Sequence, residues 1–174
     1  MYDFDGLEAL ADIPRQQARK RGGDVAMVFQ DRTTSFADLD RNASRVANGL
    51  IALGQRPQQR VGYFGKNSDR YFEVMLGALK ANMAIVGVNW RLAAPEVAYV
   101  LSDAGCEVIF ADAEFAPLIE KIGSECPRLR HRVVVDSERD GWSHYPAWRD
   151  AQGGDDPQLP IAPDDDAIQL YTSG

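Results

Sequence analysis

Short apolar runs alternate with amphipathic stretches through the middle of the chain. The apolar runs are rich in valine and isoleucine, which predicts strands at 61–64, 84–88, 108–110 and 133–135. The stretches between them carry apolar residues at helical spacing, which predicts helices at 69–81, 95–104 and 115–122. Strands that alternate with helices predict an α/β fold, in which a parallel sheet is layered between helices on both faces.

The N-terminal part of the chain predicts a helix and a hairpin. Asp12 is expected to cap the helix, which has Pro14 in its first turn and ends at the Gly-Gly pair 22–23. Two extended runs at 26–29 and 33–34 follow, with a polar turn between them. This arrangement predicts a short β-hairpin near the N-terminus.

Ser35 begins the best-defined amphipathic helix of the chain. Apolar residues recur at helical spacing from Phe36 to Leu53, and Gly54 ends the run. Ser35 and Asp38 form a variant of the capping box, with Asp in the place that Glu commonly takes. The sequence therefore predicts a long helix with a capped start.

The pattern weakens after about Gly141, and residues 150–166 form a different kind of segment. They hold six Asp and three Pro but no Lys or Arg, which predicts an exposed connector rather than core. An apolar, strand-like run follows at 167–171. We therefore divide the chain into an N-terminal α/β subdomain at 1–149, the connector, and a strand that leads into a loop at 167–174.

Composition narrows the classes of function. Hydrophobic residues make up 45% of the chain and charged residues 26%, which is typical of a globular domain, and the formal net charge is −7. An acidic chain of this kind argues against a nucleic-acid or anionic-membrane partner, which attracts clustered Lys and Arg. Cys106 and Cys126 form neither a CxxC pair nor a disulfide framework, which favours a reducing, cytoplasmic location. The sequence shows no signal peptide and no transmembrane run.

The segment 62–68 (GYFGKNS) comes nearest to a Walker-type phosphate loop. It lacks the four-residue gap and the Lys-Ser/Thr pair of that motif. We interpret it as a plain turn between a strand and a helix, in which an Asn or Ser caps the helix. A small nucleotide-binding domain that uses Gly65 and Lys66 is the alternative, because backbone amides at such a turn can hold an anion.

Other familiar chemistries find no support in the sequence. No GxGxxG follows a strand, and no GxSxG elbow occurs. Cys106, Cys126, His131 and His144 are scattered and do not form the close ligand pair of a zinc site. We therefore assign no metal ligand and no catalytic residue within these 174 residues.

The last residues of the chain are the most informative. The predicted strand ends in Thr172, Ser173 and Gly174, and small hydroxyl residues with glycine suit phosphate binding because backbone amides can approach the anion closely. YTSG at 171–174 resembles the start of the phosphate loop of adenylate-forming enzymes, which include acyl-CoA synthetases, peptide-synthetase adenylation domains and luciferases. Three more segments resemble motifs of that family in the right order, namely TSFADL at 34–39, LKANMAIVGVN at 79–89 and NWRL at 89–92.

The chain departs from the family pattern at three positions. Asn82 stands where the family usually has Gly, and Gly87 stands where it usually has Pro. Ala94 precedes Pro95, where members often have a capping Ser or Thr, and we expect this to cost the next helix about 1 kcal/mol of capping. We expect these changes to affect the backbone, and they put no named catalytic role in doubt.

The resemblance implies a Rossmann-like sheet that is the first subdomain of the family's large N-terminal domain. It implies a reaction in which a carboxylate and ATP, with Mg²⁺, form an acyl-adenylate and pyrophosphate, after which the CoA thiolate displaces AMP. Thr172, Ser173 and Gly174 would begin the loop that holds the β- and γ-phosphates of ATP. In the family the Mg²⁺ ligand, the acyl pocket and the catalytic Lys lie downstream. We therefore expect an amino-terminal fragment of an acyl-CoA synthetase that is inactive alone and binds none of these cofactors tightly.

Two alternatives stay open, namely an adenylation enzyme that loads a carrier protein and a non-catalytic interaction domain derived from this fold. The NWRL segment favours CoA, and an end inside a loop motif argues against a natural stand-alone module. In the family the strand at 168–174 pairs within another part of the large domain, so we expect it to be disordered or mispaired here. The missing partners are expected to leave an apolar patch that can drive oligomer formation.

Overall fold

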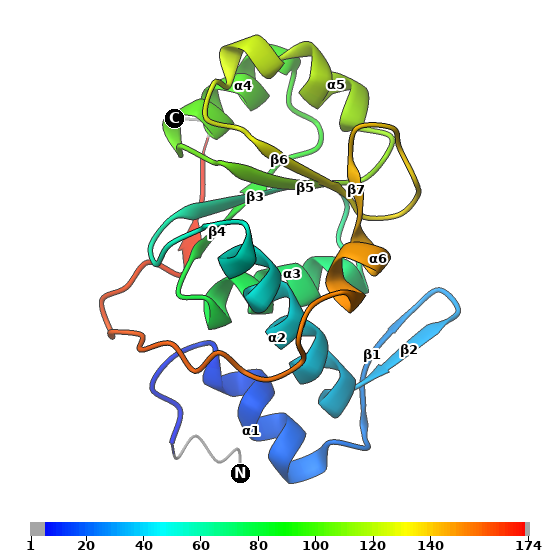
Figure 1. Cartoon of the computed structure of the whole chain (residues 1–174), viewed down its shortest axis with the longest axis vertical. Coiled ribbons are helices and arrows are strands. Elements are labelled where there is room, and N and C mark those ends of the chain that lie inside the picture. The colour runs from blue at the N-terminus through cyan, green and yellow to red at the C-terminus, as the bar shows by residue number, and fades with distance from the viewer. Residues whose placement is uncertain (1–5, 173–174) are drawn as a thin grey trace.

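A six-stranded parallel sheet forms the centre of the computed structural model, which describes residues 6–172 (Figure 1). The strand order is β7-β6-β5-β3-β4-β8, and every neighbouring pair is parallel. The prediction of a parallel α/β sheet is confirmed, and each of the four apolar runs forms a strand. The strands are β3 (Arg60–Phe64), β4 (Ala84–Val88), β5 (Val108–Ala111), β6 (His131–Val134), β7 (Ser143–His144) and β8 (Ile168–Gln169).

Helices cover both faces of this sheet (Figure 1). Alternate side chains of β3 serve the two layers, because Val61 and Tyr63 join the core on one face and Phe64 joins the core on the other. Burial on both faces explains why the strands are apolar at nearly every position. One face is covered by α2 (Phe36–Ala52), α3 (Asp69–Lys80) and α6 (Tyr145–Asp150), and the other by α4 (Ala94–Asp103) and α5 (Ala116–Lys121).

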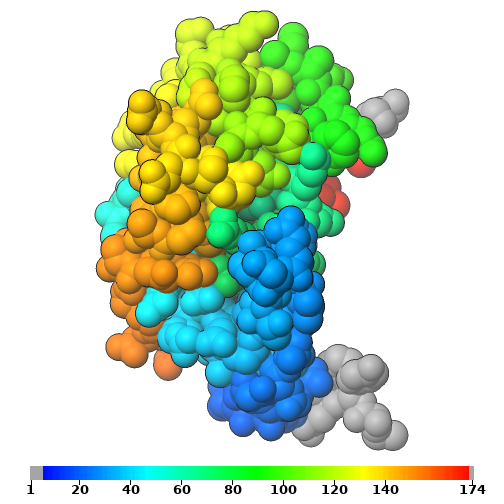
Figure 2. Space-filling view, turned by 90° about the vertical axis from the view of Figure 1, so that its right-hand side faces the viewer, coloured from blue at the N-terminus to red at the C-terminus, as the bar shows by residue number. Residues whose placement is uncertain are grey.

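The N-terminal helix and hairpin extend beyond the sheet, next to α2. The helix is α1 (Asp12–Arg21), and the antiparallel hairpin of β1 (Val25–Phe29) and β2 (Arg32–Ser35) confirms the prediction. In Figure 2 the hairpin rises from α1 along the surface of the molecule. Asp12 is the first residue of α1 rather than its cap, so that expectation is wrong. Its carboxylate instead accepts hydrogen bonds from the backbone N–H groups of residues 8 and 9, in the turn that precedes the helix.

The serine caps predicted for α2 and α3 are confirmed. Ser35 Oγ accepts a hydrogen bond from the Asp38 backbone N–H at 3.1 Å and donates one to the Asp38 carboxylate at 2.7 Å. The cap of α4 lies one residue earlier than expected, at Ala93, because Ala94 is already helical. No side chain caps this end, and the Glu96 carboxylate accepts a hydrogen bond from the Ala93 backbone N–H at 2.8 Å.

Three short elements were not predicted from the pattern. They are β7, α6 and a single 3-10 turn at Gly123–Glu125, each between two and six residues long. Elements of this length are too short to show a hydrophobic period. α6 is held in place by aromatic packing, since the rings of Tyr145 and Trp148 lie edge-on to Phe110 at centroid distances of 6.1 and 5.4 Å.

The part of the segment 168–174 that the structure describes forms a paired strand, so the expectation of disorder is wrong there. Ile168 and Gln169 form β8 and pair in parallel with Ile85 and Val86 of β4. Without β8, β4 would be the sheet edge with unpaired backbone groups, and the pairing satisfies some of them. Ile168 of β8 and Leu170 directly after the strand remain exposed, 46% and 74% accessible.

The connector runs from the end of α6 to β8 without forming a helix or strand (Figure 1, orange to red). Its residues are exposed or half-buried, which agrees with the predicted connector. However, it is fastened to α1, α2 and α3 by side chains that the composition did not reveal. The division of the chain at 150 and 167 stays an interpretation from the sequence.

Candidate functional site

The end of β8 brings Thr172, the first of the candidate phosphate-loop residues, to the carboxyl edge of the sheet. Thr172 is exposed and follows the half-buried Tyr171, while Ser173 and Gly174 lie outside the described residues. Because β8 runs parallel to β4, the chain leaves the sheet on the edge where the loop after β4 begins at Asn89. Parallel α/β sheets bind their ligands at this edge.

Tyr171 anchors the strand just before the candidate loop. Its hydroxyl donates a hydrogen bond to Asp103 Oδ2 at 2.6 Å and accepts one from Gln169 Nε2 at 2.7 Å. Its ring packs edge-on to Tyr99, with centroids 6.3 Å apart. Burial and the hydrogen bond to Asp103 raise the pKa of Tyr171 to about 12, so the phenol keeps its proton and can donate it to this bond.

Arg60 of β3 ties β8 and the end of the connector to the rest of the sheet. Its Nε donates to Gln169 Oε1 at 2.9 Å, and its Nη2 lies 2.6 Å from Asp166 Oδ2. Gln58 Oε1 accepts a hydrogen bond from the Asp166 backbone N–H at 2.9 Å. These bonds and that of Tyr171 hold the path of the chain on both sides of β8.

The topological switch point of the sheet lies between β3 and β5, because α3 and α5 follow these strands on opposite faces. Asp112 fills this point, since its carboxylate accepts a hydrogen bond from the Lys66 backbone N–H at 2.8 Å. A Cβ at Gly65 would lie 2.6 Å from Asp112 Oδ1, and Lys66 Nζ pairs with Glu114 at 2.6 Å. Burial raises the pKa of Asp112. The Asp112 carboxylate thus occupies the Lys66 backbone N–H, which a bound phosphate would need. This favours the interpretation of 62–68 as a plain turn.

Positive charge gathers around Trp90 in the loop after β4. The Arg91 guanidinium carbon lies 4.6 Å from the Trp90 ring centroid, and Lys66 Nζ lies 5.4 Å from it. Asn89 Oδ1 accepts a hydrogen bond from the Arg91 backbone N–H at 3.0 Å. The NWRL segment thus places the Arg91 guanidinium in the loop that leaves the carboxyl edge, where a cation favours an anionic ligand.

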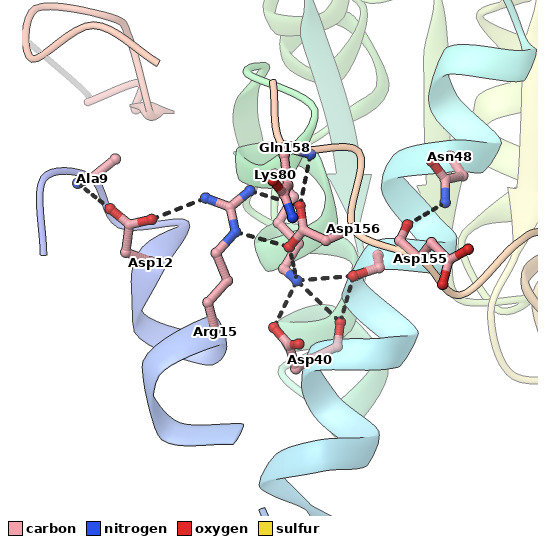
Figure 3. Close-up of polar contacts among 10 residues, drawn as sticks. Ala9, Asp12, Arg15, Asp40, Asn48, Lys80, Asp155, Asp156 and Gln158 are labelled. Atoms are coloured by element: carbon pink, nitrogen blue, oxygen red, sulfur yellow. Dashed lines mark hydrogen bonds and ion pairs between the residues drawn. The ribbon is translucent and has the colours of Figure 1, made fainter. Parts of the chain in front are cut away.

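A buried ion network joins α1, α2, α3 and the connector (Figure 3). The Lys80 side chain is fully buried, and its Nζ lies 2.6 Å from Asp40 Oδ1, 2.7 Å from Asp156 Oδ2 and 2.9 Å from Ser44 Oγ. Arg15 donates through Nε and Nη2 to the two carboxylate oxygens of Asp156, at 2.8 and 2.9 Å. Burial alone would raise the pKa of Asp156, but the hydrogen bonds from Arg15 and Lys80 outweigh it and hold the pKa well below its usual range.

Asn82 follows α3 with a backbone φ of 53°, in the left-handed region where the usual Gly of the motif fits. Its Nδ2 donates to the Pro160 carbonyl and to Asp165 Oδ2, both at 2.9 Å. Its Oδ1 accepts a hydrogen bond from Gln58 Nε2 at 2.8 Å. The departure from the family motif therefore gives the connector a second point of attachment.

Within residues 6–172, no group of three His, Cys, Asp or Glu side chains is arranged to hold a metal ion. Cys106 and Cys126 are both buried and free, and burial raises the pKa of Cys106 to about 12. A buried thiol of this kind is not a nucleophile. In the same part of the chain, no helix combines the length and the apolar character needed to cross a membrane.

Sequence reasoning missed the residues that hold the connector, above all Lys80 and Asp156. Two signals for them were present. Lys80 is a charged residue at the end of a helix that is apolar on most sides, and such a residue needs a partner. The connector has six Asp and no cation of its own, so its carboxylates had to meet cations from elsewhere in the chain.

Comparison with known proteins places these observations in a family. The model of a family described as AMP-binding enzyme matches residues 14–174. The fatty acid–acyl-carrier-protein ligase ScoC of Streptomyces coeruleorubidus is 34% identical over 169 residues, which cover 97% of this chain and 31% of that protein. A feruloyl-CoA synthase of Amycolatopsis sp is 31% identical over 167 residues, which cover 96% of this chain and 31% of that protein.

A solved structure shows the same fold. The anthranilate CoA ligase AuaEII, in complex with anthranoyl-AMP, matches with a TM-score of 0.87 and 30% identity over 94% of this chain and 32% of that one. The chain thus spans about a third of the length of the relatives that it matches. Because the family model matches nearly all of the chain, the chain belongs to the AMP-binding enzyme family, the adenylate-forming enzymes.

Proposed function

We propose that this chain is the N-terminal portion of an ATP-dependent acyl-CoA synthetase, an AMP-forming acid–thiol ligase. The observation that carries the proposal is the family match over residues 14–174, which ends in the YTSG segment. β8 brings Tyr171 and Thr172, the first two residues of this segment, to the carboxyl edge. In the proposed reaction a carboxylate attacks the α-phosphate of ATP and releases pyrophosphate. The thiol of CoA then attacks the acyl-adenylate, forms the thioester and releases AMP.

In this proposal, residues at the end of this chain contact the phosphates of ATP. Thr172 is exposed and makes no hydrogen bond to the described residues, so its hydroxyl is available to a ligand. Thr172, Ser173 and Gly174 would begin the loop that faces the β- and γ-phosphates, and Tyr171 holds the strand behind them. Mg²⁺ would neutralise phosphate charge when bound. From the resemblance to the family, we propose that the ligands of Mg²⁺ and the contacts to CoA lie in other parts of the enzyme.

The names of the relatives support a proposal for the substrate class, and the cysteines support one for the compartment. The named relatives act on fatty, feruloyl and anthranilate acids, so we propose a small-molecule carboxylate as the substrate. Two buried free thiols fit a reducing compartment, and we place the enzyme in the cytoplasm. The net charge of −7 does not favour a nucleic-acid partner.

A carrier protein is the second candidate for the thiol acceptor. One specific observation favours it, because the relative with 34% identity is named as a ligase that loads an acyl-carrier protein. Both acceptors present a thiol to the acyl-adenylate, so the first half of the reaction is the same for both. Only the second half separates the two candidates.

The test is an ATP–pyrophosphate exchange assay on the enzyme that contains this chain, with a panel of fatty and aryl carboxylates. Exchange that depends on one of these acids supports the proposal. Mass spectrometry of the products formed with CoA, or with a pantetheinylated acyl-carrier protein, then identifies the acceptor. If no acid in either class supports exchange, the proposed function is wrong.

A further inference from the structure

The chain reaches the candidate phosphate loop through a connector that a buried ion pair fastens. We propose that Asp156 and Lys80 are positioning residues for this loop: their ion pair fixes the connector, and the connector fixes β8 and therefore Thr172. The role in ATP binding rests on the proposed function, whereas the mechanical part of the inference concerns only the described residues.

The first step is the burial of Lys80. Its ammonium has no exposed surface and is held by Asp40, Asp156 and Ser44. A buried ammonium is costly unless it is paired and hydrogen-bonded, and an apolar side chain in the same place is often at least as stable. What Lys80 adds over an apolar residue is a directional bond to a segment 76 residues away in the chain. Directional bonds select one placement of that segment over others.

The second step is the geometry at Asp156. Both of its carboxylate oxygens are used: Arg15 of α1 binds them with two N–H groups, Lys80 of α3 binds Oδ2, and the Gln158 backbone N–H donates to Oδ1 at 2.8 Å. A planar guanidinium on a carboxylate fixes orientation as well as distance. In Figure 3 these groups converge on Asp156 from α1 and α3, while the Asp155 side chain points away from them. Asp156 is therefore a point at which two elements hold the connector, next to the carbonyls of residues 153 and 155 that Asn48 binds.

The third step is the short path from Asp156 to the loop. Asn82, two residues after Lys80, holds the connector again at the Pro160 carbonyl and at Asp165. Lys80 and Asn82, at the end of α3, thus bind the connector at two points before β8 begins. The chain between the second point and β8 is only a few residues long, so it transmits the placement of the connector to the strand.

The fourth step is the weakness of β8 as a strand. It pairs with β4 through two residues and has no partner on its other edge among the described residues. Its Ile168 side chain is 46% exposed. So short a pairing is marginal, and its local opening depends on what holds the flanking chain. The upstream bonds therefore act together with those of Arg60 and Tyr171 in holding Thr172 in place.

The test is Asp156→Asn in the 174-residue chain, with Asp155→Asn as the matched control. The Asp155 carboxylate makes no hydrogen bond or ion pair within the described residues, so the control makes the same chemical change one residue away. Amide hydrogen exchange is followed in peptides that cover 164–172 and in peptides from β3 and β5. We expect exchange in 164–172 to become at least about tenfold faster in Asp156→Asn, with β3 and β5 within about twofold of wild type. Asp155→Asn should change neither.

Two results would overturn the inference. One is unchanged exchange at 164–172, and the other is equal acceleration in every strand, which would mean that Asp156 supports global stability only. If Asp156→Asn does not fold, Arg15→Gln removes the guanidinium bonds to Asp156 and leaves Lys80 in place, with the same pattern expected and the same two results decisive. None of these measurements requires turnover, so they stand even if the proposed function fails.

A kinetic measurement tests the link to ATP. In the enzyme that contains this chain, Asp156→Asn is expected to raise KM for ATP by about tenfold and to leave KM for the carboxylate within about twofold, because the loop start and not the acyl pocket is displaced. A general structural defect would move both constants together. If exchange at 164–172 accelerates but KM for ATP is unchanged, Asp156 fixes β8 without positioning the loop, and that part of the proposal is wrong.

Discussion

The ends of β3 and β8 lie on the same edge of one sheet and both carry residue types that suit phosphate, yet they differ in what already occupies them. At the end of β3 the Lys66 backbone N–H is bound to Asp112, and the Lys66 ammonium is paired with Glu114. At the end of β8, Thr172 is exposed and makes no hydrogen bond to the described residues, while Tyr171 behind it is bound to Asp103. The difference indicates that an anion site requires hydrogen-bond donors that no other group of the protein already binds.

The largest expected effect is the difference in activity between this chain alone and the proposed whole enzyme. The 174 residues alone should give no ATP–pyrophosphate exchange above background with any carboxylate, because charge neutralisation and positioning at the phosphates need groups that this part does not supply. The measurement is the exchange assay at high protein concentration. Carboxylate-dependent turnover by the isolated chain would show that a complete site exists within it.

The Asp112→Ala variant tests whether the Asp112 carboxylate blocks an anion site at the end of β3. The variant leaves the Lys66 backbone N–H without its acceptor, and we expect a loss of about 1–2 kcal/mol in the free energy of unfolding in urea. Inorganic phosphate should then raise the melting temperature of Asp112→Ala but not of wild type, because the freed amide can bind an anion. An equal response of the two proteins to phosphate would mean that Asp112 does not close this turn.

The Tyr171→Phe variant tests how the Tyr171 hydroxyl holds the end of β8. The lost hydroxyl links Asp103 and Gln169, and its removal should cost about 1 kcal/mol of unfolding free energy. An absorbance titration should also lose a phenol step, since burial and Asp103 raise the pKa of Tyr171 to about 12. Tyr99→Phe keeps the ring beside Tyr171 and should retain that step. If the step persists in Tyr171→Phe, the phenol is not held as described.

A smaller effect is expected at Lys66. Its ion pair with Glu114 lies at the surface, with both side chains 54% exposed, and pairs of this kind contribute little to stability. Lys66→Ala should therefore leave the urea midpoint unchanged, and ATP should produce the same melting temperature in the variant as in wild type. An ATP-dependent rise in melting temperature that disappears in Lys66→Ala would favour the nucleotide-binding alternative at the end of β3.

The smallest effect on folding is expected at Leu170, which is 74% exposed at the end of β8. We predict that the chain self-associates through this edge at high concentration, because an exposed strand edge with apolar side chains is a template for pairing. Leu170→Lys should reduce association in sedimentation velocity without a change in unfolding free energy. Leu10→Lys, at another exposed leucine, is the control. Equal association of the two variants would contradict this role of the β8 edge.

Most of the fold could be predicted because its signals are local. The four apolar runs and the helical spacing between them identify the sheet and its layers, and Ser35 marks the start of α2. α6 and β7 could not be predicted in this way, because Tyr145 and Trp148 are held by a ring in a distant strand. The pairing of β8 rests on two residues and on anchors outside the strand, so no pattern within 167–171 reveals it.

In the candidate site too, residues with a local sequence signal could be predicted, and residues that depend on distant partners could not. Thr172 could be identified because the residue types that suit phosphate stand together in the sequence. The roles of Asp112 and Asp156 could not, because each depends on a partner from another element, and the Asp156 bond to Lys80 spans 76 positions. Local residue type therefore identifies a possible anion site, whereas long-range hydrogen bonds decide whether its donors are available.

The central claim is that the end of β8, and not the end of β3, begins the phosphate loop for ATP. The most direct measurement compares Thr172→Val with Lys66→Ala in ATP–pyrophosphate exchange by the enzyme that contains this chain. We predict that Thr172→Val lowers kcat/KM for ATP by about tenfold or more, because a hydroxyl donor to phosphate is lost, while Lys66→Ala stays within about twofold of wild type. A large loss in Lys66→Ala together with normal exchange in Thr172→Val would contradict the claim.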